Sequence, residues 1–169
     1  MSDTVDWKAL AEEVGTLRGN EEVGDAGYAR QAIEILLGEK ILRQAVEYYI
    51  SGEPGSELAR HVLWQIHPWS AMKHCYHIYK SDGDPERRRL AVELLRVVAD
   101  RRALGWIDEL LQEEDPLIQM WGAGVIEQLL LSGLVSEEEA EEQLEKAEKH
   151  ANPSVREIAN NIKERFARG

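Results

Sequence analysis

Residues that could hold a metal gather in one short stretch of the chain. Four of the five histidines and the single cysteine fall within 17 residues, at His61, His67, His74, Cys75 and His77. Imidazole nitrogens and a thiolate are the ligands that zinc and copper prefer. His74 and His77 are three residues apart and could share one face of a helix. Their spacing nevertheless matches neither His-Glu-x-x-His nor paired Cys-x-x-Cys, the established metal patterns.

The same stretch also has a purely structural interpretation. Apolar residues recur between 69 and 80 at helical spacing, which predicts a helix with one buried side. The members of this apolar stripe are Trp69, Met72, Tyr76 and Tyr79, widened by Ala71, Cys75 and Ile78. The stripe places Cys75 in the core and His77 near the surface, so the two would point apart. We therefore expect no metal and no cofactor, and a site around His67, His74 and His77 is the alternative.

Nucleophilic catalysis finds little support in the sequence. Cys75 lacks the electropositive setting at a helix N-terminus that activates a thiol. Ser70 and Ser81 lie in no nucleophile elbow, and no glycine-rich phosphate loop follows a strand. Gly122-Ala123-Gly124 more simply indicates two closely packed helices. We therefore predict no catalytic residue and expect a protein that is not an enzyme.

The net charge excludes several classes of partner. The chain carries 32 Asp and Glu residues against 20 Lys and Arg, for a net charge of −12. Nucleic acids and anionic membranes are bound by basic surfaces, so neither is an expected partner. An acidic protein suits a basic partner. The charge therefore favours a protein as the partner.

The acidity is concentrated between residues 115 and 151, where nine carboxylates stand against two lysines. Most of them belong to one run: Glu137, Glu138, Glu139, Glu141, Glu142, Glu145 and Glu148. Ser136 and Glu139 have the spacing of a capping box, and carboxylates near a helix N-terminus favour its dipole. The run indicates either a solvated helix with a thin apolar seam or an acidic face for a basic partner.

Three dipeptides mark where helices begin. They are Asp84-Pro85, Asp115-Pro116 and Asn152-Pro153, which lie 31 and 37 residues apart. An Asp or Asn side chain accepts a hydrogen bond from an otherwise unpaired N–H of the first turn. Proline suits the first helical position, where its missing N–H costs nothing. The spacing therefore predicts a repeated helical unit.

The residues after these prolines match in register. A small residue recurs at Ala91, Gly122 and Ala159, and it would let two helices approach closely. Large apolar residues recur at three further positions: Leu90, Trp121 and Ile158; Leu94, Val125 and Ile162; Val98, Leu129 and Phe166. A polar residue recurs at Arg88, Gln119 and Arg156. Such helix pairs bury their apolar faces by stacking on their neighbours.

Weaker copies of the pattern extend toward the N-terminus, and strand signals are nearly absent. We predict an all-α chain that forms a single domain over 1–169, a right-handed α-solenoid of about four and a half helix-pair repeats. The expected units are a capping helix over 4–18, repeats over about 24–52, 53–82, 83–114 and 115–151, and a terminal helix over 153–167.

The sequence Asp84-Pro85-Glu86-Arg87-Arg88-Arg89-Leu90-Ala91 resembles the start of a HEAT repeat. The resemblance is to the short bacterial repeats of the phycobilisome-lyase type, and it covers 53–167 well and 24–52 loosely. It implies that Asp or Asn caps the first helix and that Arg bonds to a neighbouring repeat. The copy at 115 departs from the pattern, with Gln119 for Arg and Gly122 for Ala. The resemblance implies an architecture, because the family has no single activity.

Three kinds of enzyme with HEAT-like repeats were weighed. Iron-dependent hydroxylases carry His-Glu pairs, and the chain contains no His-Glu dipeptide. DNA glycosylases need a basic concave surface, which the net charge argues against. Phycobilin lyases resemble the chain in repeat length, and no feature of the sequence tests that activity. A lyase-like or metal-assisted enzyme therefore remains the alternative function.

Tryptophans supply candidate anchors for a partner. Trp121 occupies the position of Leu90 and Ile158, which predicts packing in the core. Trp64 and Trp69 flank the predicted kink at 67–68, and one of them is a candidate for exposure. An exposed tryptophan on a binding face is a good anchor for a partner.

The function that we predict is protein binding, on a concave and partly acidic face lined by the second helix of each repeat. A specific version is an immunity- or inhibitor-type protein that covers a basic toxin. The expected contact residues are Lys40, Arg43, Glu47, Lys73, His77, Lys80, Arg101, Asp108, Gln112, Glu138, Glu141, Glu142 and Glu145. We expect a cytoplasmic protein, because no secretory signal is evident, and take a monomer as the default.

Overall fold

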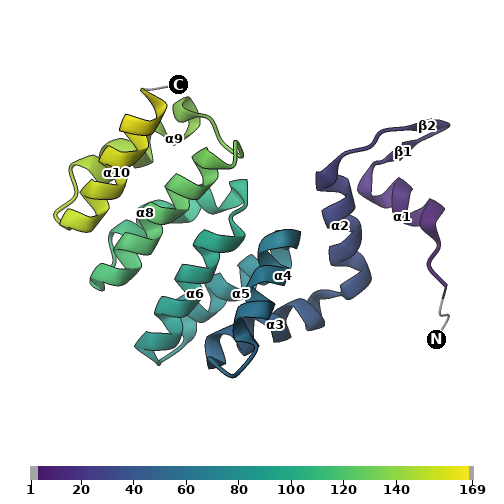
Figure 1. Ribbon diagram of the computed structural model, residues 1–169, viewed down its shortest axis with the longest axis horizontal. Helices are drawn as coiled ribbons and strands as arrows, with labels where there is room; N and C mark the ends of the chain where they lie inside the picture. Colours follow the sequence, from purple (N-terminus) through teal and green to yellow (C-terminus); the bar gives the residue numbers. More distant parts are fainter. Residues whose placement is uncertain (1–3, 168–169) are drawn as a thin grey trace.

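The computed structural model describes residues 4–167, and within them the chain is all-helical, as predicted, apart from one small hairpin (Figure 1). The helices are α1 (Trp7–Val14), α2 (Ala26–Leu37), α3 (Glu39–Ser51), α4 (Ser56–Ile66), α5 (Trp69–Ser81), α6 (Pro85–Val98), α7 (Ile107–Leu111), α8 (Pro116–Leu131), α9 (Glu137–Glu148) and α10 (Pro153–Phe166). A 3-10 helix, η1 (Arg101–Trp106), precedes α7. The hairpin joins β1 (Leu17–Arg18) to β2 (Glu21–Glu22), antiparallel. No helix within residues 4–167 is long and apolar enough to span a bilayer.

Most of the helices lie in two rows (Figure 1). In the first row α4 contacts α6, α6 contacts α8, and α8 contacts α10. In the second row α3 contacts α5, and α7 contacts α9. Each helix of the second row packs on the first-row helix that follows it in the chain, so α3 contacts α4, α5 contacts α6, α7 contacts α8 and α9 contacts α10.

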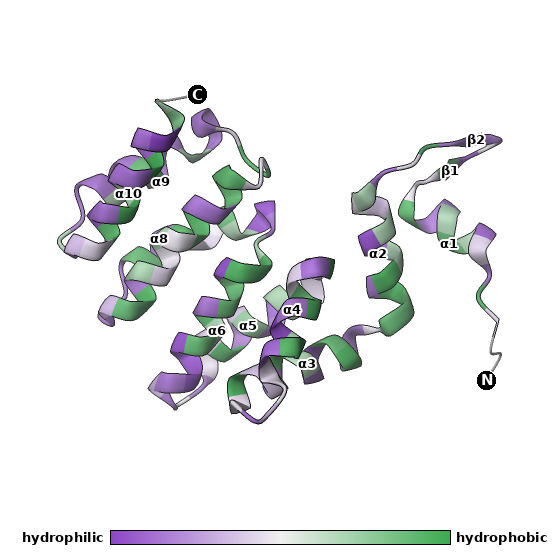
Figure 2. Cartoon of the chain, in the orientation of Figure 1, coloured by the Kyte–Doolittle hydropathy of each residue, from purple (hydrophilic) through white to green (hydrophobic). Residues whose placement is uncertain are grey.

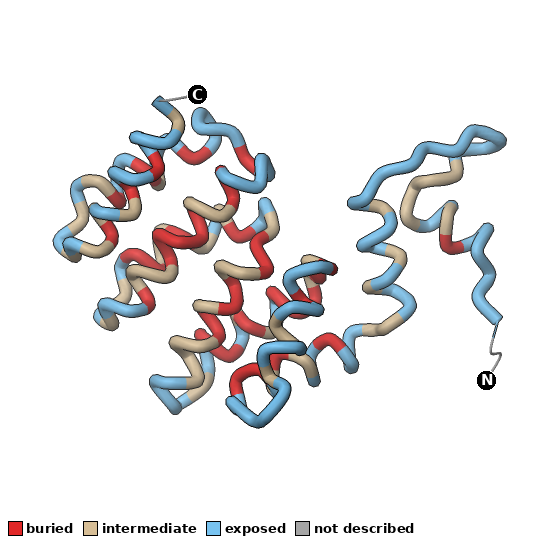
Figure 3. Tube along the Cα trace, viewed as in Figure 1, coloured by how far each residue is buried: buried red, intermediate tan, exposed pale blue. Residues whose placement is uncertain are grey.

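The core runs between the two rows from α3 to α10 and leaves out the N-terminal helices (Figure 3). Leu10 is the one buried residue of α1, and α2 contributes none. Several apolar side chains of α2 are largely exposed instead, among them Ile33, Ile35 and Leu36. Figure 2 shows that α2 carries many apolar residues, whereas α9 and α10 are mostly hydrophilic.

The three predicted helix starts are confirmed. The side chain of Asp84 accepts a hydrogen bond from the N–H of residue 86 (2.9 Å), and Asp115 and Asn152 accept the equivalent bonds at 2.9 and 3.0 Å. A proline follows each capping residue at the first helical position. The capping box of Ser136 and Glu139 is also formed at the start of α9.

The small residues allow the close approach that their register predicts. Ala91, Gly122 and Ala159 are all buried. A Cβ on Gly122 would lie 2.7 Å from the Cβ of Leu110, and a Cβ on Gly124 would lie 2.5 Å from Cδ of Arg96. Glycine at 122 therefore brings α8 against α7, as the Gly-Ala-Gly segment indicates.

The expected capping helix over 4–18 is shorter in the structure. It covers Trp7–Val14 and stops at Gly15, whose φ of 88° belongs to the left-handed region that favours glycine. The chain then forms the β1–β2 hairpin, which the sequence analysis does not predict. Trp7, placed on the apolar side of the expected helix, is 66% exposed.

The second helical segment between 100 and 114 is also interrupted. It consists of η1 followed by α7, which is only five residues long. Asp100 caps η1 by accepting the N–H of Arg102 (2.9 Å), and Gly105 lies near the change from one helix type to the other. Glycine is a poor residue for a helix interior, which is consistent with a break at this point.

Candidate functional site

Cys75 is separated from the histidines of the first candidate site. Cys75 is fully buried, and burial raises the pKa of its thiol. His74 lies between α5 and α3, with its Nε2 2.8 Å from Oε1 of Glu47. His77 is exposed beside Ser81, and its ring stacks on that of His74 with the two centroids 6.4 Å apart, so these two histidines share one face of α5. As the apolar stripe predicts, Cys75 belongs to the core and His77 to the surface.

His67 ends α4 in the left-handed conformation, with a φ of 50°, and its Nδ1 is hydrogen-bonded to the carbonyl of Val98. His61 lies on the exposed side of α4. Within residues 4–167 no three His, Cys, Asp or Glu side chains come together in a group that could hold a metal ion. The described part of the chain therefore offers no coordination shell around His67, His74 and His77.

Two of the predicted contact residues, Arg43 of α3 and Lys73 of α5, pair with the same carboxylate, that of Glu39. Glu39 binds Arg43 on its own helix (2.9 Å) and lies 3.8 Å from Nζ of Lys73 on α5. Lys40 is exposed at the edge of a hollow of about 400 Å³ that Arg43 and His74 also line. Glu39, Lys40, Arg43 and His74 thus line one hollow.

Glu47 connects three helices. Its Oε1 lies 2.8 Å from Nε2 of His74 on α5. Its Oε2 accepts a hydrogen bond from Nη2 of Arg87 on α6 at 2.7 Å. Burial opposes the ionisation of Glu47, but the hydrogen bonds from Arg87 and His74 outweigh it and lower its pKa. Arg87 also pairs with Asp82 at 2.8 Å. Glu47 therefore acts mainly within the protein, holding α3 to the next helices.

Lys80 pairs with Glu109 of α7, and the hydroxyl of Tyr76 donates to the same carboxylate (2.7 Å). Burial would raise the pKa of Glu109, and the bonds from Lys80 and Tyr76 lower it overall. Next to them the ring of Trp106 stacks between Tyr76 and Trp69, at centroid distances of 4.3 and 5.4 Å. This aromatic column fastens α5 to η1.

The contact residues on η1 and α7 reach α9. Arg101 pairs with Glu139, and Asp108 pairs with Lys146 at 2.6 Å. Lys146 also binds Glu142 on its own helix at 2.7 Å. Gln112 is exposed at the end of this row. Three of the predicted contact residues, Arg101, Asp108 and Glu142, are thus paired within the protein at this junction.

The exposed glutamates of α9 differ from the rest of the row. Glu145 pairs with Lys149 at 3.3 Å. Within residues 4–167, Glu137, Glu138 and Glu141 have neither an ion pair nor a side-chain hydrogen bond, and all three are exposed. Glu138, Glu141 and Glu145 line a hollow of about 340 Å³ together with Lys163 of α10. Unpaired negative charge therefore gathers at the outer end of the second row.

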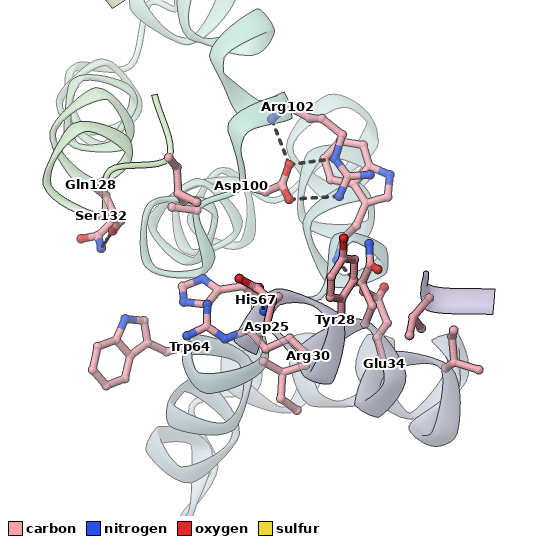
Figure 4. A pocket seen from close by; sticks show the side chains of 18 of the residues that line it. Asp25, Tyr28, Arg30, Glu34, Trp64, His67, Asp100, Arg102, Gln128 and Ser132 are labelled. Carbon is pink, nitrogen blue, oxygen red and sulfur yellow. Dashed lines mark hydrogen bonds and ion pairs between the residues drawn. The ribbon is translucent and has the colours of Figure 1, made fainter. Parts of the chain in front are cut away.

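A further hollow was not predicted from the sequence. It measures about 790 Å³ and lies between α2 and the ends of α4, α6 and α8 (Figure 4). Tyr28 and Glu34 line it from α2, Trp64 and His67 from α4, and Gln128 from α8. Trp64 is 44% exposed, so of the two tryptophans near residue 67 it is the exposed one. The sequence could indicate the tryptophan but not the helix that faces it.

No family model, no curated protein and no solved structure matches the chain.

Proposed function

We propose that the chain is an α-solenoid of HEAT-like repeats that binds another protein and catalyses no reaction. The repeated Asp-Pro or Asn-Pro caps of α6, α8 and α10 support the repeat, as does the side-by-side order of α4, α6, α8 and α10. Arg88 donates to the carbonyl of Tyr79 in the last turn of α5 (2.8 Å), and Arg156 donates to the carbonyl of His150 in the loop after α9 (2.6 Å). These bonds fix one helix against the preceding one in the manner that a stacked repeat requires.

The observation that carries the binding proposal is the contrast between the two ends of the second row. Along α3, α5 and α7 most charged side chains are paired, so their potential is largely cancelled locally. On α9 the carboxylates of Glu137, Glu138 and Glu141 are exposed and form no ion pair among residues 4–167, because the nearby Lys163 pairs with Glu148. A surface of unpaired charge gives specificity and fast association with a complementary partner.

The partner proposed for this surface is a basic protein. A more specific form of the proposal is that the chain is an immunity- or inhibitor-type protein whose acidic surface covers a basic toxin. Lysine or arginine side chains of the partner would take the place of water around the three glutamates. Other residues of the predicted set, such as Lys73 and Lys80, would contact the partner only at the rim, because they already bind carboxylates of the protein.

The test is capture of a partner with three versions of the full-length protein. The first is the wild type, and the second is the triple variant Glu137→Gln, Glu138→Gln and Glu141→Gln. The third removes the same number of charges elsewhere, by Glu21→Gln, Glu22→Gln and Glu53→Gln, all at exposed positions. Cell extracts from the natural source are passed over each protein, and the retained proteins are identified by mass spectrometry.

We expect a basic protein to be retained by the wild type and by the control triple variant, with at least about tenfold less on the α9 triple variant. Retention should also fall as salt is added, because exposed charges are screened. Equal recovery of every retained basic protein on all three would contradict the proposal.

A further inference from the structure

A second hollow, of about 260 Å³, opens on the first row of helices beside Trp64. Its lining comes from α4, α6 and α8: Arg60, His61, Trp64, Arg96, Val97 and Gln128. Two of these residues are arginines, one is a histidine, and none is acidic. The chain has a net charge of −12, whereas this hollow is lined by two cationic side chains and no carboxylate. Its local charge is therefore opposite in sign to that of the whole chain.

The two arginines are incompletely satisfied by the protein. Within residues 4–167 the one ion pair of Arg60 is with the well-exposed Glu57, at 3.5 Å, and Arg96 has none. Glu93 lies one turn before Arg96 on α6 but accepts the hydroxyl of Tyr49 (3.0 Å) instead. The Nε atoms of both arginines are buried, and neither has a hydrogen-bond partner among the described residues. Buried donors are normally paired, so both guanidinium groups keep hydrogen-bonding capacity that the described residues do not use.

Arg96 is held in place for this role. Its guanidinium lies over the ring of Trp121, 4.6 Å from the centroid, a cation–π contact that fixes the charged group. Its stem crosses Gly124, where a Cβ would lie 2.5 Å from Cδ of Arg96. Trp121 and Gly124 of α8 therefore position the side chain without neutralising it.

The neighbouring cleft does not supply an acceptor for the two arginines. It shares Trp64 and Gln128 with the smaller hollow, and Figure 4 shows both on one side of it. The carboxylates that line the cleft are Glu13, Asp25, Glu34 and Asp100. The last three accept backbone N–H groups at helix starts, at 2.5, 2.9 and 2.9 Å. They are therefore engaged in holding the fold.

We propose that the hollow beside Trp64 binds a small oxyanion, a carboxylate or a phosphate, between Arg60 and Arg96. Guanidinium groups form strong, paired hydrogen bonds with both kinds of oxyanion. The hollow is smaller than the roughly 300–1,000 Å³ typical of sites for drug-sized ligands, so it suits one charged group with a small body attached. A planar body would rest on the exposed ring of Trp64.

This site is independent of the acidic surface on α9, because it lies on the other row of helices and has the opposite charge. The outcome of a test for anion binding at this site therefore does not affect the protein-binding proposal.

The test follows the indole N–H signal of Trp64 by NMR in the intact protein, with Trp64→Phe used to assign that signal. The probes are inorganic phosphate, phenyl phosphate and benzoate, added at constant ionic strength, with phenol as the uncharged control. We expect saturable shifts of the Trp64 signal with the anions and none with phenol, with phenyl phosphate binding more tightly than inorganic phosphate. Benzoate and phenyl phosphate together distinguish a carboxylate site from a phosphate site.

Two variants decide whether the arginines are responsible. Arg60→Gln and Arg96→Gln should each weaken binding of phenyl phosphate by about tenfold, the loss of one charge-assisted hydrogen bond. Arg165→Gln makes the same change of charge at an exposed position of α10 and should bind as the wild type does. Circular dichroism verifies that each variant is folded. If Arg96→Gln does not fold, the comparison of Arg60→Gln with Arg165→Gln is the test. The proposal is overturned if no anion gives a saturable shift, or if Arg60→Gln binds as tightly as Arg165→Gln.

Discussion

Oε1 of Glu34 accepts hydrogen bonds from both the backbone N–H and the hydroxyl of Ser70, at 2.9 and 2.7 Å. Its other oxygen accepts the N–H of Trp69 at 3.2 Å. Because Pro68 precedes α5 and has no side chain that could cap it, α5 begins without a cap of its own. A carboxylate from α2 therefore satisfies the N-terminus of α5 and ties the weakly packed N-terminal helices to the rest of the molecule.

Replacing that carboxylate should destabilise the protein. Loss of a helix cap costs about 0.5–2 kcal/mol, and Glu34→Ala removes three hydrogen bonds of this kind. We expect a loss of about 1–2 kcal/mol in the free energy of unfolding, measured by urea denaturation. Glu12→Ala, on the exposed side of α1, is the matched control and should change the free energy by less than about 0.5 kcal/mol. A Glu34 variant as stable as the control would show that the cap contributes nothing.

Gly122→Ala should also destabilise the protein, even though alanine favours helices by about 1 kcal/mol over glycine. The new Cβ would meet Leu110 at 2.7 Å, so α7 and α8 would have to move apart. Overpacking of this kind costs about 1–3 kcal/mol. Taken together, the two effects predict a net loss of up to about 2 kcal/mol by thermal or urea unfolding.

Gly105→Ala provides the comparison, because no atom lies within 4 Å of a Cβ built there. It should cause no such loss. If Gly122→Ala were as stable as Gly105→Ala, α7 and α8 would not pack closely enough at Gly122 to exclude a Cβ.

Glu47 predicts a specific dependence of stability on pH. Its pKa is lowered in the folded protein from an ordinary value of 4.5, because the bonds from Arg87 and His74 outweigh the effect of burial. A lowered carboxyl pKa stabilises the folded state above the unfolded pKa, and this contribution is lost as the pH falls through the folded value. Glu47→Gln should therefore cost up to about 1 kcal/mol at pH 7, a small figure because the carboxylate is partly exposed.

The cost should shrink steadily as the pH is lowered below about 4.5, where the wild-type carboxylate becomes protonated. The measurement is the difference in free energy of unfolding between wild type and variant at pH 7 and at several values below 4.5. A difference that stayed constant across this range would mean that Glu47 stabilises the fold by packing and not by charge.

Local signals made the helix starts predictable. Asp84, Asp115 and Asn152 cap their helices through bonds that span two residues, so their sequence neighbours suffice to identify them. The cap of α5 could not be predicted in this way, because Glu34 precedes Ser70 by 36 residues. The exposure of α2 was equally hidden, since its apolar residues have the spacing of a buried helix and only the placement of the other helices leaves them uncovered.

The same distinction applies to the candidate sites. A helical repeat places Lys73, Asp108 and Glu141 on one row, but the sequence does not say which charges are cancelled by a neighbour. Pairing across helices, as between Asp108 and Lys146, depends on distances that only the packed structure fixes. The hollow of Arg60 and Arg96 is formed by helices that lie far apart in the chain, so no sequence motif corresponds to it.

The central claim is that the free carboxylates of α9 receive a basic protein partner. Carboxylate footprinting of the complex with the captured partner tests it most directly, by comparing carbodiimide labelling of each Glu and Asp in the free and the bound protein. The account predicts strong protection of Glu137, Glu138 and Glu141 on binding, with Glu21 and Glu22 of the hairpin labelled as before. Unchanged labelling of the three α9 glutamates in a saturated complex would contradict it.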